Sequence, residues 1–256
     1  MRRQKYRQKK HNNGKKMLLL SLILLFISVI FIWIYFAISI PRLQKFIFLN
    51  KTVDGGGEVV IVGSETVSKY LIDSQKLLVS SRGLGEYKLD SLWVLGEKEG
   101  YSGMLAVESV AKNYSIPIYL WKDGNKSNLS LSQAVKLKLV KFNNIKLLGS
   151  FESFDLPKAI LVEFVDDSIQ ERGVLVEVDD YTGSQRTIES VSAILGVMGT
   201  KISGYSKGND DSFDCVVLGR DKLVVNKIAS VFGCEQDIEN RDNVKIRLGG
   251  KFSERF

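Results

Sequence analysis

Residues 174–205 read VLVEVDDYTGSQRTIESVSAILGVMGTKISGY, and this stretch decides the fold class of the second half of the chain. It opens with the β-branched and aliphatic run 174–178, which predicts a strand followed by a turn. Apolar residues then recur at helical spacing until Gly199, namely Ile188, Val191, Ile194, Leu195 and Met198. Residues 201–205 read as a second strand, so the stretch predicts a strand, a helix and a strand in that order.

The same alternation of strands and helices continues downstream. We expect a strand at 213–219, a helix with apolar residues from Leu223 to Phe232, and a last strand at 244–249. The order β-α-β-β-α-β predicts a small α/β sandwich over 173–252, in which the helices cover a sheet face.

A first small α/β domain is predicted over 58–165, and a polar connector at 166–172 separates it from the second. Its expected elements are strands at 58–62 and 76–81, a helix at 101–113, a strand at 116–121, a helix at 131–142 and a strand at 159–164. The chain beyond residue 57 therefore belongs to the α/β class.

An apolar run precedes both domains. Residues 17–40 read MLLLSLILLFISVIFIWIYFAISI, 24 residues without charge, Pro or Gly. At a rise of about 1.5 Å per residue this length crosses a hydrocarbon core of roughly 30 Å, so the run predicts a transmembrane helix. A cleaved signal peptide is the alternative, although its apolar region is about 7–15 residues long. Residues 41–57 are expected to form a membrane-proximal linker.

The charge of the chain is divided unevenly along it. Eight of the 36 Lys and Arg residues lie in the tail 1–16, and the region 42–256 holds the other 28 against 29 Asp and Glu. The formal net charge of +7 is therefore the sum of +8 on the tail and −1 on the rest of the chain. This bias predicts a cytoplasmic N-terminus and an extracytoplasmic body. Membrane lipid is therefore the expected partner of the tail, and no nucleic acid is expected.

Cysteine and histidine usage limits the chemistry of the body. Cys215 and Cys234 are the two cysteines, and either they form one disulfide or they pack as two buried thiols. The only histidine, His11, lies in the tail. An extracytoplasmic active site would therefore lack imidazole, which excludes Ser-His and Cys-His catalysis and His-ligated metal sites.

The second domain resembles the C-terminal domain of LytR-CpsA-Psr envelope proteins over about 172–252. That family has a strand V-x-V-x-N with a small turn, then a helix, G-F-x-V, and a closing strand ending in L-G-x-D-F. The corresponding segments here are VEVDDYTG, ILGVMGTKI and VKIRLGGKF. Asp180 replaces the usual Asn, and Lys251 stands near the usual Asp.

The first domain is similar to the LytR-CpsA-Psr catalytic domain, in a shortened form, over about 58–165. The similarity rests on LLVSSRGLGEYKLDSLWVLGEKEG (77–100) and VESVAKNYSIPI (107–118). In that family, arginines and aspartates hold a polyprenyl-pyrophosphate sugar lipid together with a divalent metal. The resemblance makes Arg82, Lys88 and Asp90 the candidate phosphate-binding residues. The alternative for Arg82 is a solvated charge at a strand end.

Departures from the family pattern decide the expected function. Ser81 and Gly83 flank Arg82 where the family has Pro and Asp, and no arginine occurs from Gly83 to Glu171. We therefore expect a membrane-anchored extracytoplasmic envelope protein that binds or scaffolds without catalysis, with cell-wall glycopolymer or envelope proteins as partners. The alternative is a phosphotransferase that attaches a polyprenyl-pyrophosphate-linked glycopolymer to the cell wall. Only that alternative needs Mg²⁺, and we assign no catalytic residue, metal ligand or cofactor.

Overall fold

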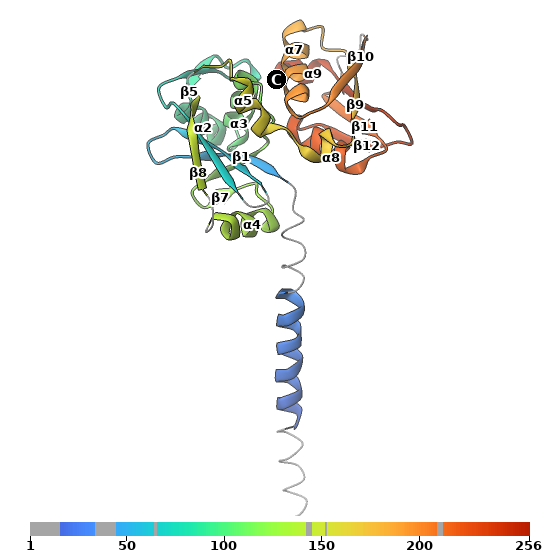
Figure 1. The fold of residues 1–256 in the computed structure, drawn as a ribbon. Helices are drawn as coiled ribbons and strands as arrows, with labels where there is room; N and C mark the ends of the chain where they lie inside the picture. The colour runs from blue at the N-terminus through green and yellow to red at the C-terminus, as the bar shows by residue number, and fades with distance from the viewer. Residues whose placement is uncertain (1–15, 34–44, 64–65, 142–144, 152, 209–211) are drawn as a thin grey trace, which may run out of the picture. The chain divides into compact units, whose positions relative to one another are not determined.

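The structure is a computed structural model that describes residues 16–33, 45–63, 66–141, 145–151, 153–208 and 212–256 (Figure 1). The chain divides into two compact units, Met1–Leu43 and Gln44–Phe256. We call the second unit the body. Within it, residues 45–165 are the first lobe and residues 166–256 the second lobe.

The described part of the first unit is one apolar helix, Lys16–Trp33, with a mean hydropathy of 2.6. It is long and apolar enough to cross a membrane by length and composition, and a signal sequence would meet the same criterion. The rest of the predicted span, residues 34–40, and nearly all of the basic tail lie outside the described residues.

A six-stranded mixed sheet with the strand order β7-β6-β1-β2-β3-β8 forms the centre of the first lobe. Its strands are β1 (Phe46–Lys51), β2 (Gly57–Val62), β3 (Val67–Ile72), β6 (Leu120–Asp123), β7 (Lys126–Ser127) and β8 (Ile145–Phe151). The antiparallel β1, β2 and β3 are built from β-branched, aliphatic and aromatic residues, which favour strands.

Helices cover the two faces of this sheet unequally. Ile47 and Leu49 of β1 face the larger core, which α2 (Leu89–Lys98) and α3 (Met104–Tyr114) complete. Phe46 and Phe48 face a smaller core, against which Leu137 packs from α4 (Leu131–Lys141). The first lobe also holds the short pair β4 (Leu77–Val79) and β5 (Glu86–Lys88), the 3-10 turns η1 (Ser81–Gly83) and η2 (Val162–Phe164), and α5 (Lys158–Leu161).

The second lobe has a five-stranded sheet with the order β10-β9-β13-β11-β12. Its elements are α6 (Asp167–Gln170), β9 (Leu175–Asp180), α7 (Gln185–Val197), β10 (Lys201–Lys207), β11 (Cys215–Gly219), α8 (Lys222–Phe232), β12 (Glu235–Ile238), β13 (Val244–Leu248) and α9 (Gly250–Arg255). Alternate residues of β9, β11 and β13 form one core with the apolar faces of α7 and α8. The predicted strand and helix order is therefore present, with β12 and α9 added to it.

Four sequence-based assignments differ from the structure, the first being the strand expected at 116–121, which begins only at Leu120 as β6. Residues 41–57 were expected to form a linker, but Phe46–Lys51 are the strand β1, in the interior of the first sheet. Residues 159–164 were expected to form a strand, but they are helical in α5 and η2, because a short apolar run has no period that distinguishes strand from helix. The connector 166–172 contains α6, whose N-terminus is capped by the side chain of Asp166.

The two lobes meet where Lys45 and Tyr119 of the first lobe line a small cavity together with Asp166 of the connector and Lys227 of α8. Lys45 Nζ of the first lobe donates to the backbone oxygen of Val165 at 2.9 Å. Asp166 forms an ion pair with Lys227 of α8, and Lys227 also donates to Ser168 Oγ at 2.8 Å. Both side chains of the Asp166–Lys227 pair are largely buried, which fixes α8 against the connector.

Candidate functional site

Arg82, the first candidate phosphate ligand, lies in η1 between β4 and β5. Its backbone has a φ of 67°, in the left-handed region that non-glycine residues seldom adopt. Its guanidinium stacks on the ring of Tyr101 at 4.0 Å from the centroid, and its Nη2 donates to Glu108 Oε1 at 3.1 Å. Arg82 is therefore already engaged by an aromatic face and a carboxylate, while its buried Nε has no hydrogen-bond partner among the described residues.

Glu108 is the carboxylate at the centre of this site. It lies on α3 with its side chain only 11% exposed, and Ser81 Oγ donates to its Oε2 at 3.2 Å. Arg255 of the second lobe approaches from the other side, with Nη1 at 3.6 Å from Oε1. Burial raises the pKa of Glu108, and the positive charges of Arg82 and Arg255 offset this only in part.

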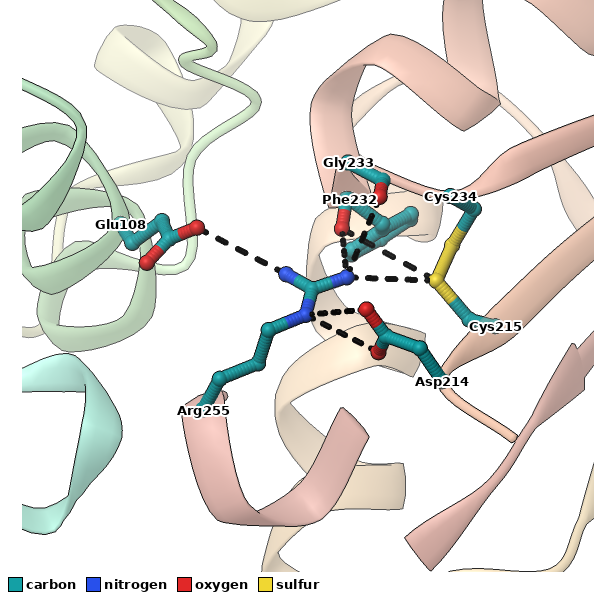
Figure 2. The surroundings of a disulfide bond; sticks show 7 residues. All are labelled: Glu108, Asp214, Cys215, Phe232, Gly233, Cys234 and Arg255. Carbon is teal, nitrogen blue, oxygen red and sulfur yellow. Dashed lines mark hydrogen bonds and ion pairs between the residues drawn. A yellow bond between two sulfur atoms is a disulfide. The ribbon is translucent and has the colours of Figure 1, made fainter. Parts of the chain in front are cut away.

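Arg255 connects Glu108 to the disulfide of the second lobe, as Figure 2 shows. Its Nε donates to both carboxylate oxygens of Asp214 at 2.9 Å, and its Nη2 donates to the backbone oxygen of Phe232 at 2.7 Å. The same Nη2 lies 3.3 Å from Cys215 Sγ. The guanidinium thus binds acceptors from two segments of the second lobe, the start of β11 and the end of α8, and one carboxylate from the first lobe.

The structure joins Cys215 to Cys234 in a disulfide. Cys215 begins β11, and Cys234 follows the C-terminus of α8, where Gly233 adopts the left-handed conformation that ends a helix. The disulfide therefore holds together two segments that supply acceptors to Arg255, Cys215 itself and the end of α8. We name the group Arg82, Glu108, Arg255 and Asp214 the interlobe charge cluster.

The other two candidate phosphate ligands have different partners. Lys88 donates to the side-chain oxygen of Gln75. Asp90 pairs with Lys51 at 3.7 Å, and Lys51 also contacts Asp123 at 3.7 Å. Neither Lys88 nor Asp90 shares a partner with Arg82 in the described residues, so no common contact links the three candidate ligands.

A small cavity lies at the junction between the lobes. Its lining includes Lys45, Tyr119, Asp166 and Lys227, and its volume is about 20 Å³. Burial and the neighbouring charge of Asp166 raise the pKa of Tyr119. Because one water molecule needs about 10–15 Å³, the cavity is too small for a pyrophosphate lipid.

The described residues also contain no group of three or more His, Cys, Asp or Glu side chains placed to hold a metal ion. The sequence patterns do not single out Glu108 or Arg255. Glu108 could have been noticed, because it is a charged residue in a helix whose other residues are mostly apolar and buried. No pattern marks Arg255, which only the fold brings to α3.

Comparison with known proteins gives no match. No family model, no curated protein and no solved structure matches this chain.

Proposed function

We propose that this chain is a single-pass, extracytoplasmic protein of the cell envelope, related to the LytR-CpsA-Psr proteins, whose body is a non-catalytic binding or scaffolding module. The apolar helix and the basic residues before it support the anchor and its orientation. The disulfide in the body supports an oxidising compartment.

One observation carries the non-catalytic assignment, namely the engagement of Arg82 by Glu108. A phosphate bound at Arg82 would compete with a carboxylate whose oxygens lie 3.0 and 3.1 Å from Nη2. Displacing it would leave the buried Glu108 with Arg255 and Ser81 as its remaining partners, and weakening the pairing of a buried charge costs free energy. The role of Arg82 in this proposal is to hold η1 against α3.

The charge cluster also supports a scaffold role for the body as a whole. Arg255 contacts Glu108 across the boundary between the lobes, and Lys227 joins α8 to the connector. Because the lobes are joined in this way, their surfaces keep a fixed position relative to each other when the body binds a partner. Cell-wall glycopolymer and other envelope proteins are the partners we propose.

The buried, unpaired Nε of Arg82 favours the alternative, a glycopolymer phosphotransferase that uses Mg²⁺. An assay with a polyprenyl-pyrophosphate-linked glycan, Mg²⁺ and peptidoglycan separates the two proposals. We expect the full chain to sediment with wall sacculi and to transfer no glycan. Transfer that is lost in Arg82→Ala would overturn the non-catalytic assignment.

The orientation has its own test, because a membrane-impermeant amine reagent labels only lysines outside the cytoplasm. We expect labelling of Lys201 and Lys222 in intact spheroplasts, since both side chains are exposed. The tail lysines should react only after lysis. Labelling of the tail in intact spheroplasts would contradict the proposed topology.

A further inference from the structure

Part of one face of the first sheet is left uncovered by the described helices. Strand alternation places Ile145 and Leu147 of β8 and Leu71 of β3 on the face that also carries Phe46 and Val67. Leu137 of α4 packs over the buried members of this face. At the β3–β8 edge the apolar side chains stay in solvent, with Ile145 46%, Leu147 63% and Leu71 38% exposed. We call these three residues the apolar strip.

The segment that contains this edge is strongly basic. From Gly124 to Phe151 the sequence has five lysines and no Asp or Glu, although residues 42–256 as a whole are nearly neutral. Lys138 on α4 and Lys146 on β8 are both exposed. The apolar strip is therefore accompanied by positive charge, which favours an anionic partner over a neutral one.

The chain enters the body at the same end of this sheet. Phe46 is opposite Val62, Val62 is opposite Val67, and Val67 is opposite Ile145 in the strand register. Three strand spacings separate Phe46 from Ile145, which is about 14 Å at 4.8 Å per strand. Only residues 34–45 connect Phe46 to the end of the apolar helix at Trp33.

We infer that the α4–β8 end of the first lobe docks on the anionic headgroup surface of the membrane that holds the anchor. Ile145 and Leu147 enter the interfacial region, and Lys138 and Lys146 contact lipid phosphates. The inference rests on the proposed membrane anchor. Pairing of β8 with β8 of a second copy is less favourable, because it would bring two lysine-rich segments together.

The test uses the full chain in nanodiscs of phosphatidylcholine alone or with about 30% phosphatidylglycerol, with hydrogen exchange of the peptides over 131–141 and 145–151 as the readout. We expect slower exchange in the anionic discs. Each lysine near an anionic surface raises the affinity for that surface by a factor of about five. The double variant Lys138→Gln with Lys146→Gln should therefore weaken docking about 30-fold and remove the difference in exchange rate between the two kinds of disc. The control Lys201→Gln with Lys222→Gln changes two exposed lysines of the second lobe and should keep the difference in exchange rate between the discs.

The outcomes separate this inference from the proposed function. A chain that does not enter nanodiscs overturns the anchor and the docking with it. A chain that enters them but exchanges equally in both lipids overturns the docking alone. Protection that rises with protein concentration, and is equal in both lipids, would identify a second copy as the occupant and overturn membrane docking.

Discussion

Arg255 binds one acceptor in the first lobe and several in the second, so its side chain has consequences in both. Its side chain is 12% exposed, and its guanidinium contacts the carboxylates of Glu108 and Asp214. A buried guanidinium of this kind is stabilising only while its acceptors remain paired. Substitution of Arg255 therefore tests directly how the lobes are joined.

Arg255→Ala should destabilise the body by about 3 kcal/mol, because it leaves Asp214 without its cation, Glu108 with Arg82 as its remaining cation, and two backbone oxygens without this donor. Urea unfolding of the full chain in detergent measures the change. Arg241→Ala is the matched control, since Arg241 pairs with Glu239 at 3.4 Å on the surface and should cost less than about 1 kcal/mol. Equal losses in the two variants would contradict the role given to Arg255.

Glu108 makes stability depend on pH in a defined direction. Burial raises its pKa above the ordinary value of 4.5, so the folded protein keeps a proton at pH values where the unfolded chain has released it. The free energy of unfolding should therefore fall as the pH rises from about 4.5 through the folded pKa, and stay level above it. Glu108→Gln should remove this dependence in unfolding curves measured from pH 4 to 8. If the free energy of unfolding of Glu108→Gln fell by the same amount over this pH range, the pH dependence would belong to another group.

The sequence of the second lobe predicts its helices α7 and α8 but does not predict its edge strand β12. The apolar residues of α7 and α8 repeat at helical spacing, and Ser184 and Asp221 cap them as their residue types favour. All four residues of β12 are exposed, so this strand has no apolar pattern to reveal it. Nor could the sequence reveal the partner of Arg82, because pairing with Glu108 depends on how η1 packs against α3.

The disulfide should contribute about 3 kcal/mol, because it closes a loop between residues 19 apart. Cys215→Ala with Cys234→Ala should lower the midpoint of thermal unfolding accordingly. Reductant should lower the midpoint of the wild-type chain by a similar amount and leave the double variant unchanged. A reductant effect on the double variant would locate the sensitivity elsewhere.

Close packing of α2 on the chain before α3 predicts opposite effects for two helical glycines. A Cβ on Gly96 of α2 would lie 2.1 Å from the backbone oxygen of Ser102, whereas a Cβ on Gly196 of α7 would meet nothing within 4 Å. Gly96→Ala should therefore destabilise by about 2 kcal/mol or more, and Gly196→Ala should stabilise by up to about 1 kcal/mol. Urea midpoints of the two variants measure this, and a stabilised Gly96→Ala would contradict the packing of α2.

At the scale of the whole body, the connector determines whether the lobes unfold together. Lys227 holds Asp166 and Ser168 beside α8, and Arg255 adds a second contact through Glu108. We expect amides of β2 and β13 to share one opening free energy in native-state hydrogen exchange. Lys227→Met should make the two values differ, because Asp166 then loses its buried partner. Lobes that already open at different free energies in the wild-type chain would contradict this coupling.

The packing of Phe256 has a consequence for the order of events during synthesis. Its ring stacks on Phe252 at 5.0 Å and meets Phe232 at 5.8 Å, so residues close to position 256 complete the core that β9 begins some eighty positions earlier. The first lobe contains all strands of its own sheet before residue 152 and can fold while translation continues. The second lobe must wait for its last aromatic residues, so until then α7 and α8 expose apolar faces that a chaperone would recognise.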